Sequence, residues 1–503
     1  MSALLSRTMH TVAALLVATV ALGQWNFRLD TAFRTSITMR NVNSMAFLST
    51  GEILLSGIVR FLEDEITVPE RYLALIDLDG DRVPSFPHGH GGHRITPWAD
   101  RFYVSTGLVR RLDPEGLLDP TFIHMNSGPY FSNHFNGDYH AYPDGRILMT
   151  GQHFLSDSTR GFIGRHNLIW FSNEGYLDTT RIHRKGNHCW VGHIQELPPG
   201  PYQGGFICTS TCTTFEDHAV DWIFRTDSLG IPDTTFRTGV FIGDARTFLP
   251  LPDGRVYAGG NFRRSAAPND TLGLARFMPD GSLDPAFTIP QFASGEGLTA
   301  PFGPYVYRVM PWAEGGLLVT GDFKYVNGEP RHGLCMIDST GQLLPAFAGN
   351  WMGNFVDGSI TSSTIVDVLP NADTSAIYIC GQYVGYGDGE ITDPTQRFVS
   401  RLLVEKDSPT QVQEAPPSKP PALRLHPNPA SHWVAMNYHL PGYNGEVTLV
   451  VRDAGGRVLH QLKAAGEQGQ RVWDTRELAP GVYVVELQGM GRVPHSARLV
   501  VQP

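Results

Sequence analysis

One motif recurs along this 503-residue chain and limits its fold more than any other feature: a short apolar run that ends in glycine. Counting one degenerate copy, it occurs seven times, at spacings between 44 and 61 residues. Such a period is typical of propellers and repeat arrays, in which each unit buries its apolar faces against its neighbours. The copies end at Gly57, Gly107, Gly151, Thr209 (the degenerate copy), Gly260, Gly321 and Gly381.

A second motif accompanies the first: a turn glycine, often Leu-Asp-Pro, and then phenylalanine. It is clearest in DGSLDPAF (280–287) and EGLLDPTF (115–122), whereas EGYLDTTR (174–181) has Arg181 in place of phenylalanine. Asp-Gly supplies a turn residue with positive φ, and proline ends a strand ladder because it has no N–H to donate. The two motifs divide a unit such as 307–347 into four short strands.

This pattern predicts an all-β chain with a seven-bladed β-propeller of four-stranded blades over residues 24–405. Hydrophobic residues make up 41% of the chain, which is enough to bury a core. A closed ring needs no exposed sheet edge if both ends of the repeat region share one blade. We therefore expect 397–404 to supply the third strand of the last blade and 26–33 the fourth.

The ends of the chain lie outside the repeats. Residues 1–23 have an apolar stretch of 12 residues at 11–22, too short to span a bilayer, and small residues suited to cleavage before Gln24. They predict a signal peptide, with an uncleaved anchor as the alternative, and no later run predicts a transmembrane span in the mature chain. Residues 406–422 are rich in proline and predict an extended linker. Residues 423–503 predict a small Ig-like β-sandwich.

Residues 253–260 and 280–287 carry DGR…G and DGxxDxxF elements. In this they resemble the delta-60 repeat β-propeller family, and 144–151 repeats the first element. The resemblance implies the fold and says almost nothing about a ligand.

The C-terminal segment closely resembles the type A C-terminal sorting domain of the type IX secretion system. The resemblance implies passage through the periplasm and across the outer membrane, with that secretion machinery as a partner and frequent removal of the domain. We therefore expect a secreted or outer-membrane-surface protein; an ordinary Ig-like accessory domain is the alternative. The matching residues are Pro427, Asn428, Pro429, Asp453, Gly456, Arg457, Pro480, Gly481 and Tyr483.

Charge excludes one class of partner. The chain has 39 Lys and Arg against 49 Asp and Glu, a formal charge of −10. General nucleic-acid binding needs a basic surface that releases counterions, so no nucleic-acid partner is predicted.

Two segments contain residues that ligate metals elsewhere, but neither is complete. His88, His90 and His93 lie within six residues without an acidic or cysteine partner at motif spacing. The stretch 77–81 begins like a calcium loop, but its twelfth position is His88 rather than glutamate. The sequence therefore predicts no metal and no cofactor.

The chain has five cysteines, too few for disulfides to be its main framework. Cys189, Cys208 and Cys212 lie close together, and three interpretations stay open: a local disulfide, buried free thiols or an incomplete metal site. We favour a disulfide of Cys189 with one of the other two. Cys335 and Cys380 lie in apolar strands and predict core positions.

No catalytic fingerprint is found, and no catalytic residue is predicted. The leading hypothesis is a non-enzymatic binding or adhesion module for a glycan, peptide or protein ligand at the propeller face. Phe262 and Tyr325, in the longest polar loops, are candidate contacts, although packing at the loop base is the favoured role. The alternative is an extracellular polysaccharide hydrolase or lyase, and a third possibility is a purely structural module of a surface layer. Carboxylates with a histidine or arginine at the axial opening would favour the enzyme.

Overall fold

The chain divides into two compact units, Met1–Pro409 and Thr410–Pro503. The computed structural model describes residues 25–64, 70–86, 89, 91–105, 107–123, 130–267, 270–294, 303–358, 360–406, 422–443, 445–489 and 495–502. The predicted signal peptide, and all but the two end residues of the predicted linker, lie outside these ranges. The described residues contain no helix long and apolar enough to cross a membrane; their one helical element is the short turn η1 (Ala313–Gly315).

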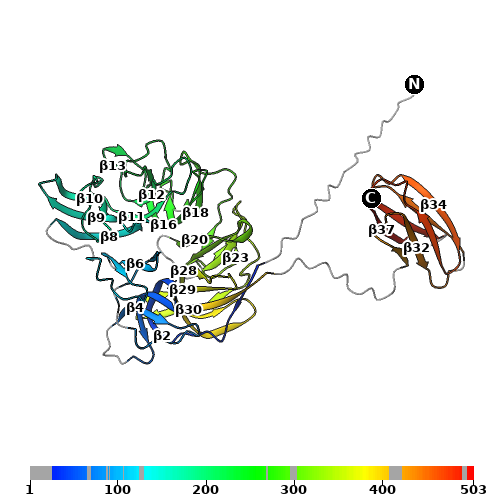
Figure 1. Cartoon of the computed structure of the whole chain (residues 1–503), viewed down its shortest axis with the longest axis horizontal. Helices are drawn as coiled ribbons and strands as arrows, with labels where there is room; N and C mark the ends of the chain where they lie inside the picture. Colours follow the sequence, from blue (N-terminus) through cyan, green and yellow to red (C-terminus); the bar gives the residue numbers. More distant parts are fainter. Residues whose placement is uncertain are drawn as a thin grey trace, which may run out of the picture. The chain divides into compact units, whose positions relative to one another are not determined.

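The first unit consists of three-stranded antiparallel sheets that follow one another along the chain around a common centre (Figure 1). These sheets are β2 (Ile37–Phe47), β3 (Ile53–Phe61) and β4 (Arg71–Ile76); β5 (Ile95–Trp98), β6 (Arg101–Ser105) and β7 (Val109–Leu112); β8 (Phe131–Ala141), β9 (Ile147–Asp157) and β10 (Phe162–Phe171); β11 (Val191–Glu196), β12 (Phe206–Ser210) and β15 (Ile223–Thr226); β16 (Ile242–Pro250), β17 (Val256–Arg263) and β18 (Thr271–Phe277); and β20 (Val306–Pro311), β21 (Leu317–Gly321) and β24 (Leu334–Ile337).

A larger sheet combines both ends of the unit: β28 (Thr364–Pro370), β29 (Ala376–Gly387), β30 (Thr392–Lys406), β1 (Trp25–Leu29) and β25 (Trp351–Met352). Short strands decorate the loops: β13 (Thr214–Phe215) with β14 (His218–Ala219), β19 (Phe292–Ala293) with β22 (Tyr325–Val326) and β23 (Glu329–Pro330), and β26 (Phe355–Asp357) with β27 (Ile360–Ser362).

The first strands of the sheets contact one another in a circle. β8 contacts β11, β11 contacts β16, β16 contacts β20, β20 contacts β28, β28 contacts β2, and β2 contacts β5. The remaining step is made by Tyr139 of β8, whose hydroxyl donates to the carbonyl of Tyr103 in β6 at 2.8 Å. Sheets arranged radially in this way, with their first strands innermost, define a β-propeller.

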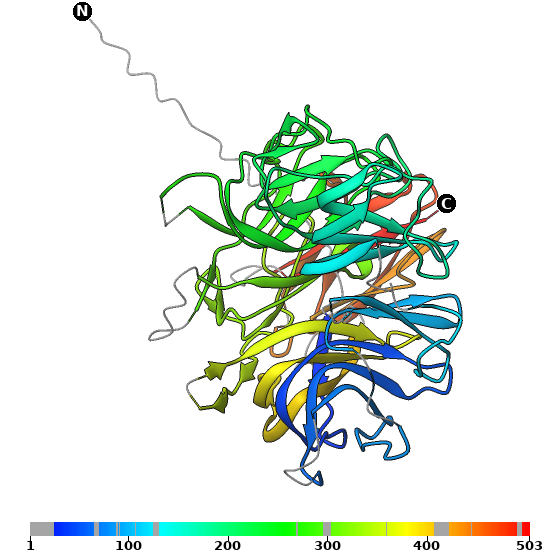
Figure 2. The ribbon, with the colours of Figure 1, turned by 90° about the vertical axis from the view of Figure 1, so that its left-hand side faces the viewer.

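The ring closes as the sequence predicts. β1 pairs with β30 from Trp25 opposite Lys406 to Leu29 opposite Leu402, so the N-terminal strand completes the last sheet. An ion pair between Asp30 and Arg401, with Oδ2 and Nη2 2.7 Å apart, strengthens the junction. Figure 2 shows the blue N-terminal strands beside the yellow strands of this sheet. The closing strand covers an edge that would otherwise be open to pairing with other chains.

The fourth strand is much shorter than predicted. In six sheets it is reduced to an isolated bridge, for example between Phe277 and Leu283. The cause is the residue that follows: Asp284 N donates to the Arg276 carbonyl at 2.9 Å, and the chain then turns so that Phe287 N donates to the Asp284 carbonyl at 3.1 Å. This turn and the proline at 285 end the ladder.

Behind three of these turns, and in the sheet that closes the ring, lies a contact that we call the Arg–Asp–Phe clamp. Arg276 Nε lies 2.7 Å from Asp284 Oδ2, both side chains are about 5% exposed, and the guanidinium lies 5.1 Å from the centre of the Phe287 ring. The clamp combines an ion pair with a cation–π contact, and its members satisfy one another in the absence of water. It recurs as Arg111–Asp119–Phe122, Arg225–Asp233–Phe236 and Arg401–Asp30–Phe33.

Three sheets replace the clamp. In the β2–β4 sheet, Leu75 and Val83 take the arginine and aspartate positions and pack in an apolar cluster. In the β8–β10 sheet, Trp170 takes the arginine position and Arg181 the phenylalanine position, and the guanidinium still lies 5.7 Å from an indole ring centre. The exchange explains why Arg181 departs from the sequence motif. In the β20–β24 sheet, buried Met336 and partly buried Leu344 replace the ion pair with an apolar contact.

The second unit consists of two antiparallel sheets that share one apolar core. The first contains β31 (Leu423–His426), β32 (Trp433–His439) and β35 (Gln468–Asp474), and the second contains β34 (Val458–Ala465), β33 (Glu446–Arg452), β36 (Gly481–Gly489) and β37 (His495–Val501). Met436 of the first sheet and Val485 of the second are both fully buried in that core.

Candidate functional site

The innermost strands of the propeller surround a cavity of about 850 Å³. Every sheet of the ring contributes to its wall, which is the arrangement expected of a ligand site at a propeller axis. The residues that line it and carry ionisable or amide groups are Asn41, Asn43, His93, Arg94, Asp138, His193, Gln195, Glu196, Arg246, Tyr307, Arg308, Asp322, Asp367 and Gln382.

Bulges in the inner strands direct side chains into this cavity. The pairing of β16 with β17 shifts between Ala245 and Thr247, and the extra residue is Arg246, which lines the cavity. β20 has the same shift between Val306 and Arg308, with Tyr307 as the extra residue. A β-bulge leaves one residue unpaired and re-aims its side chain.

The glycine that ends each apolar run permits this close packing. A Cβ at Gly260 would lie 2.2 Å from the carbonyl oxygen of Asp244 in β16, so only glycine fits. The bulged position is therefore tied in sequence to the glycine. Asn43, His93, Arg246 and Tyr307 each lie 14 residues before a landmark glycine, namely Gly57, Gly107, Gly260 and Gly321. Of these four residues, the sequence analysis named only His93, as part of an incomplete metal motif. It missed the other three, and this spacing is the signal that would have found them.

One group in the wall is an ion-pair cluster around Asp138. Arg94 Nη1 lies 3.3 Å and His193 Nδ1 3.5 Å from Asp138 Oδ2. Burial alone would raise the pKa of Asp138, but the charge of Arg94 and the contact with His193 outweigh it and lower the pKa to about 2. Burial lowers the pKa of neighbouring His93. Asp138 is therefore ionised and already partnered at neutral pH.

Two further ion pairs involve arginines that line the cavity. Arg308 Nε lies 3.1 Å from Asp367 Oδ1, and Ser44 donates to Asp367 Oδ2 at 3.1 Å. Arg246 Nε lies 2.7 Å from Asp244 Oδ2, and its guanidinium lies 5.3 Å from the Tyr305 ring centre. All three axial arginines thus have a carboxylate partner.

Asp322 is different from these carboxylates. Its Oδ1 accepts a hydrogen bond from the Tyr305 backbone N–H at 2.5 Å, but it forms no ion pair within the described residues. Burial raises the pKa of Asp322 to about 6, and burial likewise raises the pKa of adjacent Tyr307 to about 12. Asp322 therefore exchanges its proton near neutral pH, where a group that binds or transfers protons is effective.

The C-terminal ends of the inner strands make another part of the cavity wall apolar. Phe248 and Leu249 of β16 and Val309 and Met310 of β20 line it there. The cavity thus combines charged and apolar surfaces, as binding sites for organic ligands commonly do.

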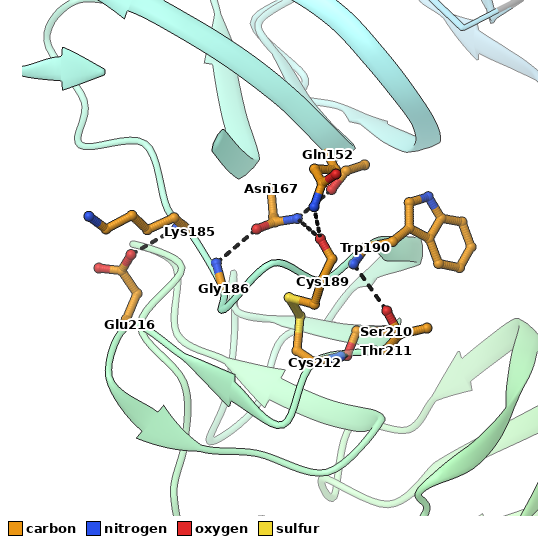
Figure 3. Close-up of a disulfide and its surroundings, with 11 residues drawn as sticks. Gln152, Asn167, Lys185, Gly186, Cys189, Trp190, Ser210, Thr211, Cys212 and Glu216 are labelled. Atoms are coloured by element: carbon orange, nitrogen blue, oxygen red, sulfur yellow. Dashed lines mark hydrogen bonds between the residues drawn. A yellow bond between two sulfur atoms is a disulfide. The ribbon is translucent and has the colours of Figure 1, made fainter. Parts of the chain in front are cut away.

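A disulfide anchors one of the strands that builds the cavity. Cys189, just before β11, is bonded to Cys212, just after β12 (Figure 3). Cys208 is a buried free thiol. The carbonyl of Cys189 accepts hydrogen bonds from Gln152 at 2.9 Å and from Asn167 at 2.8 Å. These contacts fix the start of β11, which carries His193 to the cavity. The free thiols of Cys335 and Cys380 are also buried.

The other residues singled out in the sequence do not meet at this site, apart from His93, which lines the cavity. His88 and His90 lie outside the described residues. Asp77 Oδ1 accepts the backbone N–H groups of Asp79 and Asp81, at 3.0 and 2.9 Å, as a turn-forming side chain. No group of three or more possible metal ligands is present in the described parts of the chain. Phe262 is fully buried in β17, whereas Tyr325 is 38% exposed.

In the second unit, Asn428 connects the first part of the domain to its last strand. Its Nδ2 donates to the Arg498 carbonyl at 2.7 Å, and its Oδ1 accepts from Val500 N at 2.8 Å. Ala430, after Pro427 and Pro429, forms a parallel bridge with Val501. The Pro-Asn-Pro segment is thus placed to hold β37.

The remaining motif residues shape turns. Asp453 Oδ1 accepts the N–H groups of Gly455 and Arg457 at 3.0 and 2.9 Å, and Gly456 has a φ of 80°, which favours glycine. The Tyr483 hydroxyl donates to the Ala479 carbonyl at 2.7 Å, across Pro480 and Gly481.

Two family models match parts of the chain. Residues 251–287 match a domain of unknown function described as a β-propeller (DUF5122), and residues 424–502 match the secretion system C-terminal sorting domain. No curated protein matches the chain. The chain therefore carries a β-propeller and a type IX sorting domain, and belongs to the secreted or cell-surface proteins.

Solved structures show distant similarity. PorZ of Porphyromonas gingivalis, an essential bacterial surface component of the type IX secretion system, is 13% identical over 90% of this chain and 68% of its own, with a TM-score of 0.34. A Bacteroides caccae protein of unknown function is 15% identical over 48% of this chain and 79% of its own, with a TM-score of 0.25. Dimeric latent PorU of P. gingivalis is 9% identical over 76% of this chain and 35% of its own, with a TM-score of 0.14.

Proposed function

We propose that this protein is a surface-exposed or secreted binding module whose ligand, a glycan, peptide or protein segment, enters the axial cavity of the propeller. The observation that carries the proposal is that the inner strands of every sheet contribute unlike polar and charged side chains to one cavity. Concave sites with a few convergent polar groups are the usual place for ligands.

The proposed architecture has seven blades, and its support is that each landmark copy falls in or beside the second strand of a different sheet. The proposed domain limits are a signal peptide at 1–23, the propeller at 24–405, a linker at 406–422 and an Ig-like sorting sandwich at 423–503. Mass spectrometry of the mature N-terminus tests the first limit: a peptide beginning at Gln24 is expected, and one beginning at Met1 would refute it.

Export is proposed to depend on the second unit and its motif residues, which include Asn428, Asp453 and Tyr483. Deleting residues 423–503 is expected to leave the propeller inside the cell, as measured by fractionation. Deleting 11 residues within the linker, 407–417, is the control and should leave export unchanged. The intact mass of the protein from the medium shows whether the sorting unit is removed.

Ligand binding is tested with the full chain on a glycan array and a peptide library. Hits should compete with one another and be weakened by Arg308→Ala, which removes an axial side chain. Asp100→Ala, on an exposed turn outside the cavity, should bind normally. Binding that is insensitive to every axial substitution would contradict the proposal.

A second candidate is a polysaccharide hydrolase or lyase acting at the same axis. It is favoured by Asp322, whose pKa is raised to about 6, lining the same cavity as ionised Asp138, because acid–base chemistry needs carboxyls with separated pKa values. Release of reducing ends or unsaturated products from polysaccharides, abolished by Asp322→Asn, would establish it. Binding without turnover would leave the binding module.

A further inference from the structure

Among the aspartates of the cavity wall, Asp322 alone forms no ion pair with an arginine in the described structure. Asp138 is paired with Arg94, and Asp367 with Arg308. Only Oδ1 of Asp322 is occupied, by the Tyr305 N–H. Within the described residues, its Oδ2 is therefore an acceptor without a hydrogen-bond donor.

The position of Asp322 in the repeat supports a special role. It directly follows the landmark Gly321, and the residues that directly follow the other landmark glycines are uncharged: Ile58, Leu108, Gln152, Asn261 and Gln382. A carboxyl at this position is not required by the fold, because the other sheets form without one. An acid retained in a buried place at an energetic cost is typical of a functional group.

Charge in the cavity restricts what can sit beside Asp322. A cationic ligand would meet Arg94, Arg246 and Arg308, and an anionic ligand would meet Asp138, Asp367 and Asp322 itself. A neutral ligand with many hydroxyl groups would be repelled by neither the arginines nor the carboxylates. Between the charged pairs, the wall presents amides and hydroxyls that both donate and accept hydrogen bonds, and these are Asn41, Asn43, Ser44, Ser105, Thr247, Thr364 and Gln382.

We infer that the axial cavity binds a neutral carbohydrate chain and that Asp322 Oδ2 accepts a hydrogen bond from one of its hydroxyl groups. This inference rests on the proposed binding function and specifies its ligand class. The nearby Tyr307 and the apolar part of the wall offer surfaces for the C–H faces of sugar rings. Such a site needs no metal and no cofactor.

Binding should depend on pH because only ionised Asp322 is a pure acceptor. The groups that face it are Tyr305, just before β20, Tyr307 in β20, and Arg246 and Asp244 from β16. Both tyrosines have raised pKa values and stay neutral. Since the pKa of Asp322 is about 6, affinity should rise as the pH increases from 5 to 7.5.

The test is isothermal titration of the full chain with tetrasaccharides that differ in charge. Cellotetraose, mannotetraose and chitotetraose are neutral, the deacetylated form of chitotetraose is cationic, and tetragalacturonate is anionic. Binding of at least one neutral tetrasaccharide is expected, with affinity reduced about tenfold by Asp322→Asn, since hydrogen bonds to charged groups are the stronger class. Asp100→Asn, on an exposed turn, is the matched control.

Every outcome of these titrations either supports the inference or overturns it. A wild-type affinity that rises with pH and a flatter profile for Asp322→Asn support the inference, since the two proteins differ only at residue 322. If the variant does not fold, the wild-type profile and the charge series still test it. Preference for a charged tetrasaccharide, or for a peptide, overturns the inference but leaves the binding function. Unchanged affinity in a folded Asp322→Asn also overturns it. No binding of any sugar, peptide or protein ligand overturns the binding function as well.

Discussion

The outer ends of the propeller sheets and their innermost strands follow opposite rules. At the outer end, four sheets share the same Arg–Asp–Phe clamp with nearly the same geometry. At the inner end, corresponding positions hold Asn43, His93, Arg246 and Tyr307, four different chemistries in one frame. Positions that hold the same residues from sheet to sheet therefore belong to the scaffold, and inner-strand positions whose residues differ from sheet to sheet line the candidate site. Four predictions test this contrast, from the largest expected effect to the smallest.

Removing the strand that closes the ring should reduce the stability of the propeller more than any other change. Deleting residues 24–34 removes β1 together with the buried side chains of Phe27, Leu29 and Phe33. At roughly 1.5–3 kcal/mol for each buried side chain, the loss is about 5–9 kcal/mol, and the whole propeller should unfold earlier as one unit. Calorimetry measures this, with deletion of 407–417 as the control of equal length. An unchanged Tm would refute the closing role of β1.

Breaking one Arg–Asp–Phe clamp should have the second-largest effect on stability. Arg276→Ala removes one of the two arginines that pair with the buried Asp284 carboxylate, while Arg255 Nη1 stays 3.3 Å from Asp284 Oδ2, and should cost about 1.5–3 kcal/mol in urea unfolding. The double variant Arg276→Met with Asp284→Leu copies the apolar pair of Met336 and Leu344 from the next sheet, and should lie within about 1 kcal/mol of the wild type. If the double variant is as unstable as the single one, the clamp is not an exchangeable scaffold element.

The third-largest effect is expected from acidic pH, which should destabilise the region around the β8–β10 sheet. Burial lowers the pKa values of His140, His153 and His183 to about 4. Their folded pKa lies below the ordinary 6.5, so the stability they contribute is complete above pH 6.5 and is lost as the pH falls toward 4. At pH 5 each is expected to cost about 1–2 kcal/mol.

The Tm should therefore fall between pH 7 and pH 5, and His153→Gln should fall less steeply than the wild type. Equal slopes for the two proteins would show that His153 does not titrate in the folded state.

The smallest stability effect is expected at the axis. Asp322 has a raised pKa, so its contribution to stability is largest below pH 4 and is lost as the pH rises through 6. Asp322→Asn should therefore raise stability at pH 7.5 by about 1 kcal/mol, after allowance for screening in an open cavity, while it weakens ligand binding. Thermal melts at pH 4 and 7.5 measure this; destabilisation at pH 7.5 would give Asp322 a structural role instead.

Much of the scaffold could be predicted because its determinants are local. The sheets could be predicted from the landmark glycines, the Asp-Gly turns and the recurrent phenylalanines. The closing strand could be predicted from the motif at 26–33, which has no repeat unit before it. The length of the fourth strand could not be predicted, because the turn at Asp284 depends on a buried arginine in the neighbouring strand. The Trp170–Arg181 exchange was visible only as a missing phenylalanine, since its meaning lies in a contact across the sheet.

The candidate site was harder because its residues come from strands far apart in sequence. Arg94, Asp138 and His193 form one cluster only after three sheets are arranged in a ring. The sequence analysis instead singled out Phe262, which is buried, and the histidines at 88 and 90, which lie outside the described residues. For the cysteines, it left open whether Cys208 or Cys212 is the partner of Cys189, because both lie at a suitable separation; the structure pairs Cys212.

The most direct test of the contrast between scaffold and site is an experimental structure of the full chain with the tetrasaccharide that binds most tightly in the titrations. Density for sugar rings in the axial cavity, with a hydroxyl within hydrogen-bonding distance of Asp322 Oδ2, is the predicted result. Density on the outer ends of the sheets with an empty axis would contradict it, because the ligand would then bind the part of the molecule that repeats.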